Sequence, residues 1–153
     1  MTVTNWIERQ YYWLLAALDD FALWPVQTLA RIAVGMVFLQ SGLNKLESWE
    51  PTLALFRDEY RLPFIPYQLA AELGTTVEIT GSLLLLVGLL SRLATLPLLG
   101  MIAVIEVFVY PQAWVEHLTW ATLLLLILLR GAGPISIDHL IARLATRRAL
   151  LHS

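Results

Sequence analysis

Hydrophobic residues run along most of this chain in long blocks that polar residues interrupt only briefly. Four blocks approach or reach the roughly 20 residues that an α-helix needs to cross a bilayer. We predict that they are transmembrane helices, over residues 24–43, 67–90, 93–110 and 114–129. The fourth block is the weakest, because its purely apolar part, LTWATLLLLILL, also fits a buried helix of a soluble protein. Trp114 and Trp120 favour the membrane interpretation, since indoles gather at the membrane interface.

A soluble helical bundle is the alternative to a membrane protein. Each of its helices would need a polar stripe facing water, and the runs LLLLVGLL and LLLLILL leave no room for one. Composition points the same way: 58% of the 153 residues are hydrophobic and only 14% are charged, against about a quarter charged in a soluble domain. The fold predicted is an all-α membrane protein, a single domain over residues 1–153 built as a four-transmembrane-helix bundle.

Ahead of the first predicted span, residues 1–23 form a pattern typical of an interfacial amphipathic helix. Apolar and aromatic residues recur there at helical spacing: Ile7, Tyr11, Leu14, Leu18 and Phe21. Acidic and basic residues occupy the rest of the surface: Glu8, Arg9, Asp19 and Asp20. A helix of this kind lies in the interface with its apolar face in lipid. Because its acids weaken attraction to anionic lipid, we expect aromatic burial to hold it down.

The first external loop, residues 47–66, carries the pattern of a short helix. Prolines bound it, because proline is favoured in the first turn and cannot continue a helix: Pro51, Pro63 and Pro66. Three apolar or aromatic residues share one face of it: Leu53, Phe56 and Tyr60. We predict that this helix forms a lid over the mouth of the bundle.

Basic residues fall mostly on one side of the four spans: Arg9, Arg31, Arg92, Arg130, Arg143, Arg147 and Arg148. On the other side, basic residues are outnumbered by acids in the first loop and missing from PQAWVEH. Positive residues mark the cytoplasm, so we place both termini there. The start lacks the basic and apolar regions of a cleaved signal peptide, and we expect the first span to act as an uncleaved insertion signal.

The tail, residues 130–153, leaves the membrane through GAGP and forms a basic cytoplasmic helix. A solvated end is one interpretation of this helix, and binding to anionic membrane lipid is the other.

Ionisable residues lie inside the apolar spans, where a charge at the helix centre costs roughly 2.5–3.5 kcal/mol. At that cost they should face one another instead of lipid. In the second span a carboxylate belongs to a stripe with small residues, which let another helix come close: Gly74, Glu78, Gly81, Leu85, Gly88 and Arg92. Arg31 and Arg92 lie at the cytoplasmic end, where snorkelling to the interface explains them without a function.

Four ionisable residues fall at one depth, because the second and fourth spans enter from outside and the third leaves toward it. They are the candidate catalytic residues: Lys45, Glu78, Glu106 and His117. We predict that they share a polar cavity in the outer half of the bundle, where Lys45 keeps at least one carboxylate ionised. The candidate cofactor-binding residues are Glu78 and Lys45, with two aromatic residues on the same helix faces as Glu106 and His117: Tyr110 and Trp120.

Two interpretations of this cluster stay open. In the functional one, the residues bind a polar head group or relay protons, with proton affinities shifted into the working range. In the structural one, they only tie helices together, at about 0.6 kcal/mol per contact. Repeated burial of charge for so little stability favours the functional interpretation.

Several chemistries are excluded or weak. The chain has no cysteine, so it holds no cysteine-ligated iron–sulfur cluster. His117 is the one histidine within the predicted spans, which argues against a bis-histidine haem. We assign no metal ligands, because Glu106, Glu116 and His117 lack a second histidine or thiol beside them. A net charge of -2 and a short basic tail give no sign of nucleic-acid binding.

Read in order, RIAVGMVFLQSGLNKL, VEITGSLLLLVGLLSRLA and GAGPISIDHL resemble the DoxX family of small four-span bacterial membrane proteins. The resemblance covers roughly residues 29–141. Its motif positions are Arg31, Gly42, Lys45, Glu78, Gly81, Gly88, Arg92, Gly133, Ser136 and Asp138. One departure is GAGP where the family more usually has the order G-P-G.

The resemblance implies a redox-associated subunit of the bacterial inner (plasma) membrane, with a quinone or quinol near Glu78 and a partner subunit or homo-oligomer. It leaves open whether the protein is itself an oxidoreductase. The alternative is a non-enzymatic scaffold or assembly subunit of a membrane complex, linked to metal or oxidative-stress homeostasis. A third interpretation, transport through the bundle, needs a polar path through both halves, and the inner halves of the second, third and fourth spans offer little.

Overall fold

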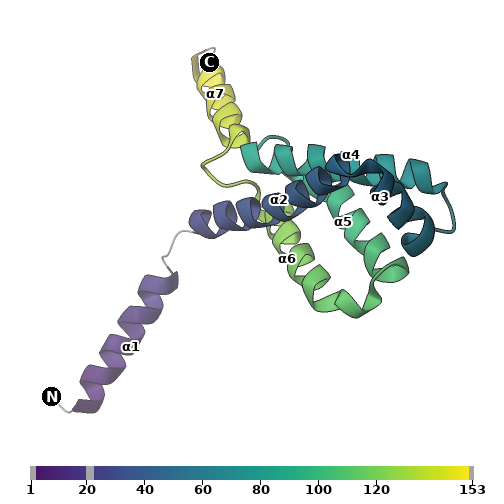
Figure 1. Cartoon of the computed structure of the whole chain (residues 1–153). Coiled ribbons are helices and arrows are strands. Elements are labelled where there is room, and N and C mark those ends of the chain that lie inside the picture. The colour runs from purple at the N-terminus through teal and green to yellow at the C-terminus, as the bar shows by residue number, and fades with distance from the viewer. Residues whose placement is uncertain (1–2, 20–22, 152–153) are drawn as a thin grey trace.

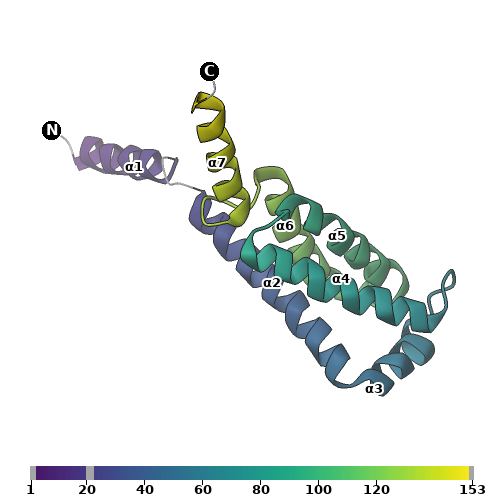
Figure 2. The same ribbon diagram turned by 90° about the horizontal axis from the view of Figure 1, so that it is seen from above.

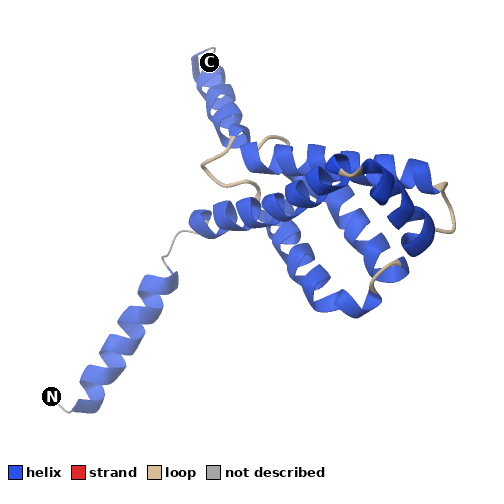
Figure 3. Ribbon diagram, in the orientation of Figure 1, coloured by secondary structure: helices blue, strands red, loops and turns tan. Residues whose placement is uncertain are grey.

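The computed structural model describes residues 3–19 and 23–151, and the side chains of 6–16 and 23–147 within them. All regular structure in these residues is helical (Figure 3). The helices are α1 (Val3–Asp19), α2 (Trp24–Glu47), α3 (Trp49–Ala54), the π-helix η1 (Leu55–Tyr60), α4 (Tyr67–Val87), α5 (Ser91–Phe108), the 3-10 turn η2 (Pro111–Ala113), α6 (Trp114–Arg130) and α7 (Ile137–Leu151).

Four helices are long and apolar enough to cross a membrane, with 24 residues in α2, 21 in α4, 18 in α5 and 20 in η2 with α6. They run alternately up and down and pack as one bundle (Figures 1 and 2). The prediction of a four-helix membrane bundle is confirmed. Both α1 and α7 leave the bundle at one end, which we call the α7 end, and α3 lies at the other, the α3 end (Figure 1).

Residues from all four spans make up the core of the bundle. Its fully buried side chains are Val34, Leu85, Leu98, Leu124 and Ile127. Small residues bring the backbones together around it, because a helix without side-chain bulk can be approached closely. A Cβ atom on Gly81 would lie 3.1 Å from Leu98 of α5, and one on Gly35 would lie 3.1 Å from Leu86 of α4. The packing of α2, α4 and α5 therefore depends on glycine.

The turn between α4 and α5 begins earlier than the predicted spans implied: it covers residues 88–90, whereas the prediction left only residues 91–92 between the two spans. α4 ends at Val87 because Gly88 takes a left-handed conformation, with φ +71°, and the amide of Leu89 closes the helix on the carbonyl of Leu84. α5 begins at Ser91, so Arg92 lies on α5. The predicted stripe on α4 thus holds from Glu78 to Gly88, all buried, but does not continue to Arg92.

All three predicted helices outside the spans are present as helices, the basic tail helix as α7. α1 covers most of residues 1–23; of its predicted apolar positions, the side chain of Leu18 and the whole of Phe21 lie outside the described residues. Its place in the membrane interface stays a prediction. The predicted lid consists of α3 and η1, which pack against the start of α4 through Phe56, Ala70 and Ala71. The left-handed residue Arg61, φ 43°, ends η1.

Candidate functional site

An ion pair between α2 and α4 lies at the centre of the candidate site. The ammonium nitrogen of Lys45 lies 2.7 Å from Oε1 and 2.8 Å from Oε2 of Glu78. It also donates to the hydroxyl of Ser41 at 2.7 Å, and that hydroxyl donates to Oε1 of Glu78 at 3.0 Å. All three ammonium hydrogens are thus used. Both side chains are nearly covered, with 4% of Glu78 and 14% of Lys45 exposed.

Local sequence explains how the two helices come close enough to form this pair. Ser41 and Lys45 are four residues apart on α2 and share a face. Between them lies Gly42, where a Cβ atom would come within 2.7 Å of Ile79 and 3.1 Å of the Glu78 Cβ. A larger residue would push α4 away from α2 at the level of the carboxylate. Gly42 is therefore the residue that permits the contact.

The lid is anchored directly on this pair. The hydroxyl of Thr52, a buried residue of α3, donates to the backbone carbonyl of Lys45 at 3.0 Å. Farther along the lid, the rings of Phe56 and Tyr60 pack edge to face, with centroids 4.7 Å apart. α3 and η1 therefore hold a fixed position over the α3 end of the bundle.

A cavity of about 210 Å³ lies beneath η1, between α4 and α5. Lys45 and Glu78 are the charged residues of its lining, and most of the rest is aliphatic or aromatic. Leu73 and Gly100, which also line it, lie on predicted spans and are exposed. The cavity therefore opens sideways toward lipid.

Tyr60 adds a hydroxyl group to the lining of this cavity. Burial raises the pKa of Tyr60 above its ordinary value, and the neighbouring Tyr110 and the charge of Glu78 add to the rise. The Tyr60 phenol is therefore a neutral hydrogen-bonding group at all ordinary pH values. Tyr110, a predicted cofactor-binding residue, lies outside the cavity lining; its ring packs on Tyr60 and its hydroxyl donates to Glu59.

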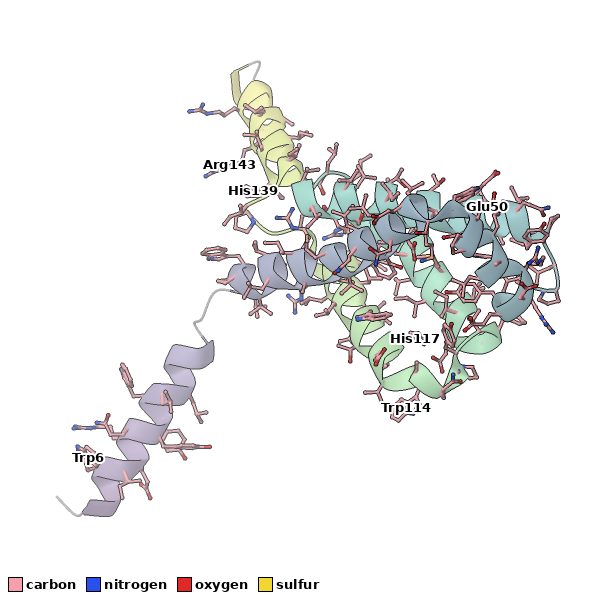
Figure 4. All side chains as sticks on the ribbon, in the orientation of Figure 1. Trp6, Glu50, Trp114, His117, His139 and Arg143 are labelled. Atoms are coloured by element: carbon pink, nitrogen blue, oxygen red, sulfur yellow. The ribbon has the colours of Figure 1, made fainter. Side chains whose placement is uncertain are left out.

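Glu106 and His117 form a second pair, on the other side of α5. The Nδ1 atom of His117 lies 2.5 Å from Oε2 of Glu106. His117 is buried, whereas 32% of the Glu106 side chain is exposed. Both line a hollow between α5 and α6, with Trp114 and Leu118 at its edge, and Figure 4 shows His117 on α6.

The prediction of one cavity shared by all four ionisable residues is wrong. Lys45 and Glu78 line the cavity under the lid, and Glu106 and His117 line the separate hollow. The reason is the rotation of α5, which turns Met101 and Ile105 toward α4 and Glu106 toward α6. Trp120 is no free anchor at the interface, since its ring packs on Phe38 and against His117.

A third polar cluster holds the α7 end together. Arg31 is only 3% exposed, so its predicted snorkelling to the interface is wrong. Its guanidinium donates instead to the carbonyls of Leu85 at 3.1 Å and Ile135 at 2.6 Å. Gly88 makes room for it, because a Cβ atom there would lie 2.1 Å from the Nη1 atom. Arg92 is exposed, as snorkelling requires.

Asp138 ties the segment after α6 to the turn between α4 and α5. Its carboxylate accepts hydrogen bonds from the backbone amides of Leu90 at 2.7 Å and Ser91 at 2.9 Å. These amides open α5 and have no partner inside the helix. The amide of Asp138 in turn donates to the carbonyl of Gly88 at 2.8 Å. Asp138 therefore acts as a cap supplied from a distant part of the chain.

Comparison with known proteins bears on this arrangement. The model of the DoxX family matches residues 26–111, more than half of the chain. The chain belongs to the DoxX family. No curated protein and no solved structure matches it. The matched DoxX region contains the Lys45–Glu78 pair, the lid and Glu106, and it ends before His117 and Asp138.

Sequence reasoning missed two residues that shape the site. Ser41 could have been found, because it precedes Lys45 by one helical turn. Thr52 carried no such signal, since its bond to the Lys45 carbonyl depends on how the lid folds back.

Proposed function

We propose that this DoxX protein is a redox-associated membrane subunit that binds the head group of a quinone or quinol in the cavity beneath η1. One observation carries the proposal: a hydrogen-bonded, nearly covered Lys45–Glu78 pair borders an otherwise largely apolar cavity that opens toward lipid. An amphiphile dissolved in the bilayer can reach such a cavity without passing through water. A carboxylate beside a cation inside a membrane protein is also a common place for proton exchange.

The size of the cavity fits a head group and excludes a whole lipid-soluble cofactor. Pockets for drug-sized ligands measure about 300–1,000 Å³, whereas this one measures about 210 Å³. A single substituted ring fits, and its isoprenoid tail stays in the lipid beside Leu73 and Gly100. Ring stacking on Phe56 or Tyr60 of the lid adds to the affinity.

The polar groups of the lining match the two oxygens of such a ring. The Tyr60 hydroxyl can donate a hydrogen bond, which suits a carbonyl oxygen. The Lys45 ammonium, whose hydrogens are held by Ser41 and Glu78, adds a positive charge beside that oxygen. The Glu78 carboxylate accepts one, which suits the hydroxyl of the reduced form. Haem or an iron–sulfur cluster would need histidine or cysteine ligands, and neither residue type lines this cavity.

When bound, the quinone supplies the two-electron chemistry, and the electrons pass to or from a redox centre on a partner subunit. The residues of this chain bind, orient and exchange protons. Glu78 would accept one of the two protons that oxidation of the quinol releases, and the second would pass to water at the α3 end. When the quinone is reduced, Glu78 would return its proton. Lys45 stabilises the carboxylate between these steps, and Ser41 holds both groups in place. The lid keeps water from the apolar lining.

Equilibrium binding of a short-tailed quinone to the purified protein tests this function. Glu78→Gln and Lys45→Met should each weaken binding at least tenfold, because each removes one group that faces the ring. Glu72→Gln is the matched control, since Glu72 lies on the same helix and is exposed outside the cavity lining. Unchanged binding in both site variants would refute the assignment.

A second candidate, a scaffold or assembly subunit, rests on the Glu106–His117 pair. A carboxylate with 32% of its side chain exposed on a membrane-spanning helix is costly in lipid, and a partner helix packed over the α5–α6 hollow removes that cost. Copurification of partner proteins separates the candidates. Loss of partners from Glu106→Gln, with quinone binding intact, would favour the scaffold; loss of quinone from Glu78→Gln, with partners retained, would favour the redox subunit.

A further inference from the structure

The positive charge of Arg31 is buried at the α7 end without an acidic partner. Two of its nitrogens donate to backbone carbonyls, and its Nε atom has no partner among the described residues. No described carboxylate comes within salt-bridge distance of it. Asp138 acts on Arg31 only through space, and its own oxygens are occupied by two amides. Burying a cation without a paired anion is costly, so an anion from outside the chain would stabilise Arg31.

An apolar hollow of about 470 Å³ adjoins this guanidinium. Arg31 and the polar residues Thr28 and Ser136 share its lining with aliphatic side chains of α2, α4, α7 and the segment before α7: Ile32, Leu86, Val87, Ile135, Ile137 and Leu140. Cationic and aliphatic surfaces side by side suit a ligand with an anionic head and an apolar chain. Inorganic anions would gain nothing from the aliphatic wall.

α7 extends the basic surface beyond this hollow. His139, Arg143 and Arg147 are spaced four residues apart and line one groove with Leu140 and Leu144. Leu140 lines both this groove and the hollow beside Arg31, so the two surfaces are continuous. Figure 4 shows His139 and Arg143 on α7 where it leaves the bundle. This is the end that we predict to face the cytoplasm, whose leaflet carries anionic lipid.

We propose that the hollow beside Arg31 and the basic groove of α7 together form a binding site for an anionic phospholipid. The phosphate lies between the guanidinium groups of Arg31, Arg143 and Arg147, and an acyl chain lies along Ile32 and Leu86. Binding joins α7 to the bundle, to which Asp138 otherwise ties it by hydrogen bonds with the turn between α4 and α5. The site is independent of the quinone cavity at the α3 end.

Native mass spectrometry of the full chain in neutral detergent tests this proposal. Phosphatidylglycerol and phosphatidylcholine with identical acyl chains are offered together, and retained lipid is counted. We expect phosphatidylglycerol to be preferred. A basic residue near a lipid surface contributes about 1 kcal/mol, or roughly a fivefold change, so Arg143→Gln with Arg147→Gln should weaken binding about 25-fold. Arg130→Gln is the control, because Arg130 lies at the same end but lines neither surface.

Filling the hollow with a larger side chain tests whether the lipid binds there. Ile32→Trp places an indole in the lining and should abolish the preference for phosphatidylglycerol. Leu29→Trp is the matched control, since Leu29 is exposed on the same helix outside the hollow. Equal retention of the two lipids by the unaltered protein would overturn the proposal, as would equal binding by Ile32→Trp and Leu29→Trp. Displacement of the lipid by equimolar inorganic phosphate would also overturn it, because it would indicate a site for the free anion.

Discussion

Removing one member of the Lys45–Glu78 pair is the sharpest perturbation that the structure suggests. Lys45→Met takes away all three hydrogen bonds of the ammonium group and leaves the Glu78 carboxylate with the single bond from Ser41. Glu78→Gln can keep an acceptor for Ser41, but it removes the negative charge and replaces one oxygen that accepts from Lys45 with an amide nitrogen. The double variant, Lys45→Met with Glu78→Gln, leaves no buried charge at this position.

Burial decides the size of each effect. If the pair only ties helices together, three contacts at about 0.6 kcal/mol each amount to about 2 kcal/mol. If it is a buried ion pair, loss of one partner costs about 3–5 kcal/mol. Glu78 is 4% exposed and lies inside α4, so Lys45→Met should reach the upper range. Glu78→Gln should cost less, because Lys45 is 14% exposed and lies near the end of α2, where its ammonium can turn outward.

Unfolding by sodium dodecyl sulfate from neutral micelles, followed by circular dichroism, measures these free energies. The double variant should lie within about 2 kcal/mol of the unaltered protein, since replacing a whole buried pair is often neutral. The Glu72→Gln variant should be unchanged and controls for loss of a carboxylate from α4. A double variant as unstable as the sum of the two single ones would show that Lys45 and Glu78 are not coupled, and the reasoning would fail.

Three further predictions concern the remaining polar groups and glycines. Gly88→Ala should lower the free energy of unfolding by about 1–3 kcal/mol, because the φ of Gly88 is +71° and the new Cβ would meet Arg31. Gly100→Ala is the control: its Cβ would meet nothing within 4 Å, so it should be neutral or stabilising in the same detergent assay. Asp138→Ala should cost about 0.5–2 kcal/mol, as loss of a helix cap does, and an unchanged midpoint would contradict its role as a cap. Burial raises the pKa of Tyr60, so the folded state favours the neutral phenol. The resulting contribution to the free energy of unfolding is present below pH ~10 and is lost as the pH rises above it. Tyr60→Phe should therefore make unfolding less sensitive to alkaline pH, and an identical pH profile would argue against burial of the phenol.

The helical class and the number of spans could be predicted because hydropathy is a local property. Each block of about 20 apolar residues specifies a crossing by itself, whatever its neighbours do. The same holds for the lid, which proline bounds on both sides, and for the glycine stripe of α4. The burial cost of charge in the spans also singled out Lys45 and Glu78, and both are motif positions of the DoxX family.

The sequence by itself thus determined that charged groups lie inside a four-helix membrane bundle and must turn away from lipid. Only the tertiary structure decided which groups meet. Glu78 pairs with Lys45 because Gly42 lets α2 approach α4. Glu106 pairs with His117 because α5 turns Glu106 toward α6. Arg31 turns inward because carbonyls from two distant segments converge on it. These choices depend on helix rotation and backbone separation, which are set by packing between segments far apart in the chain, and hydropathy carries no information about either.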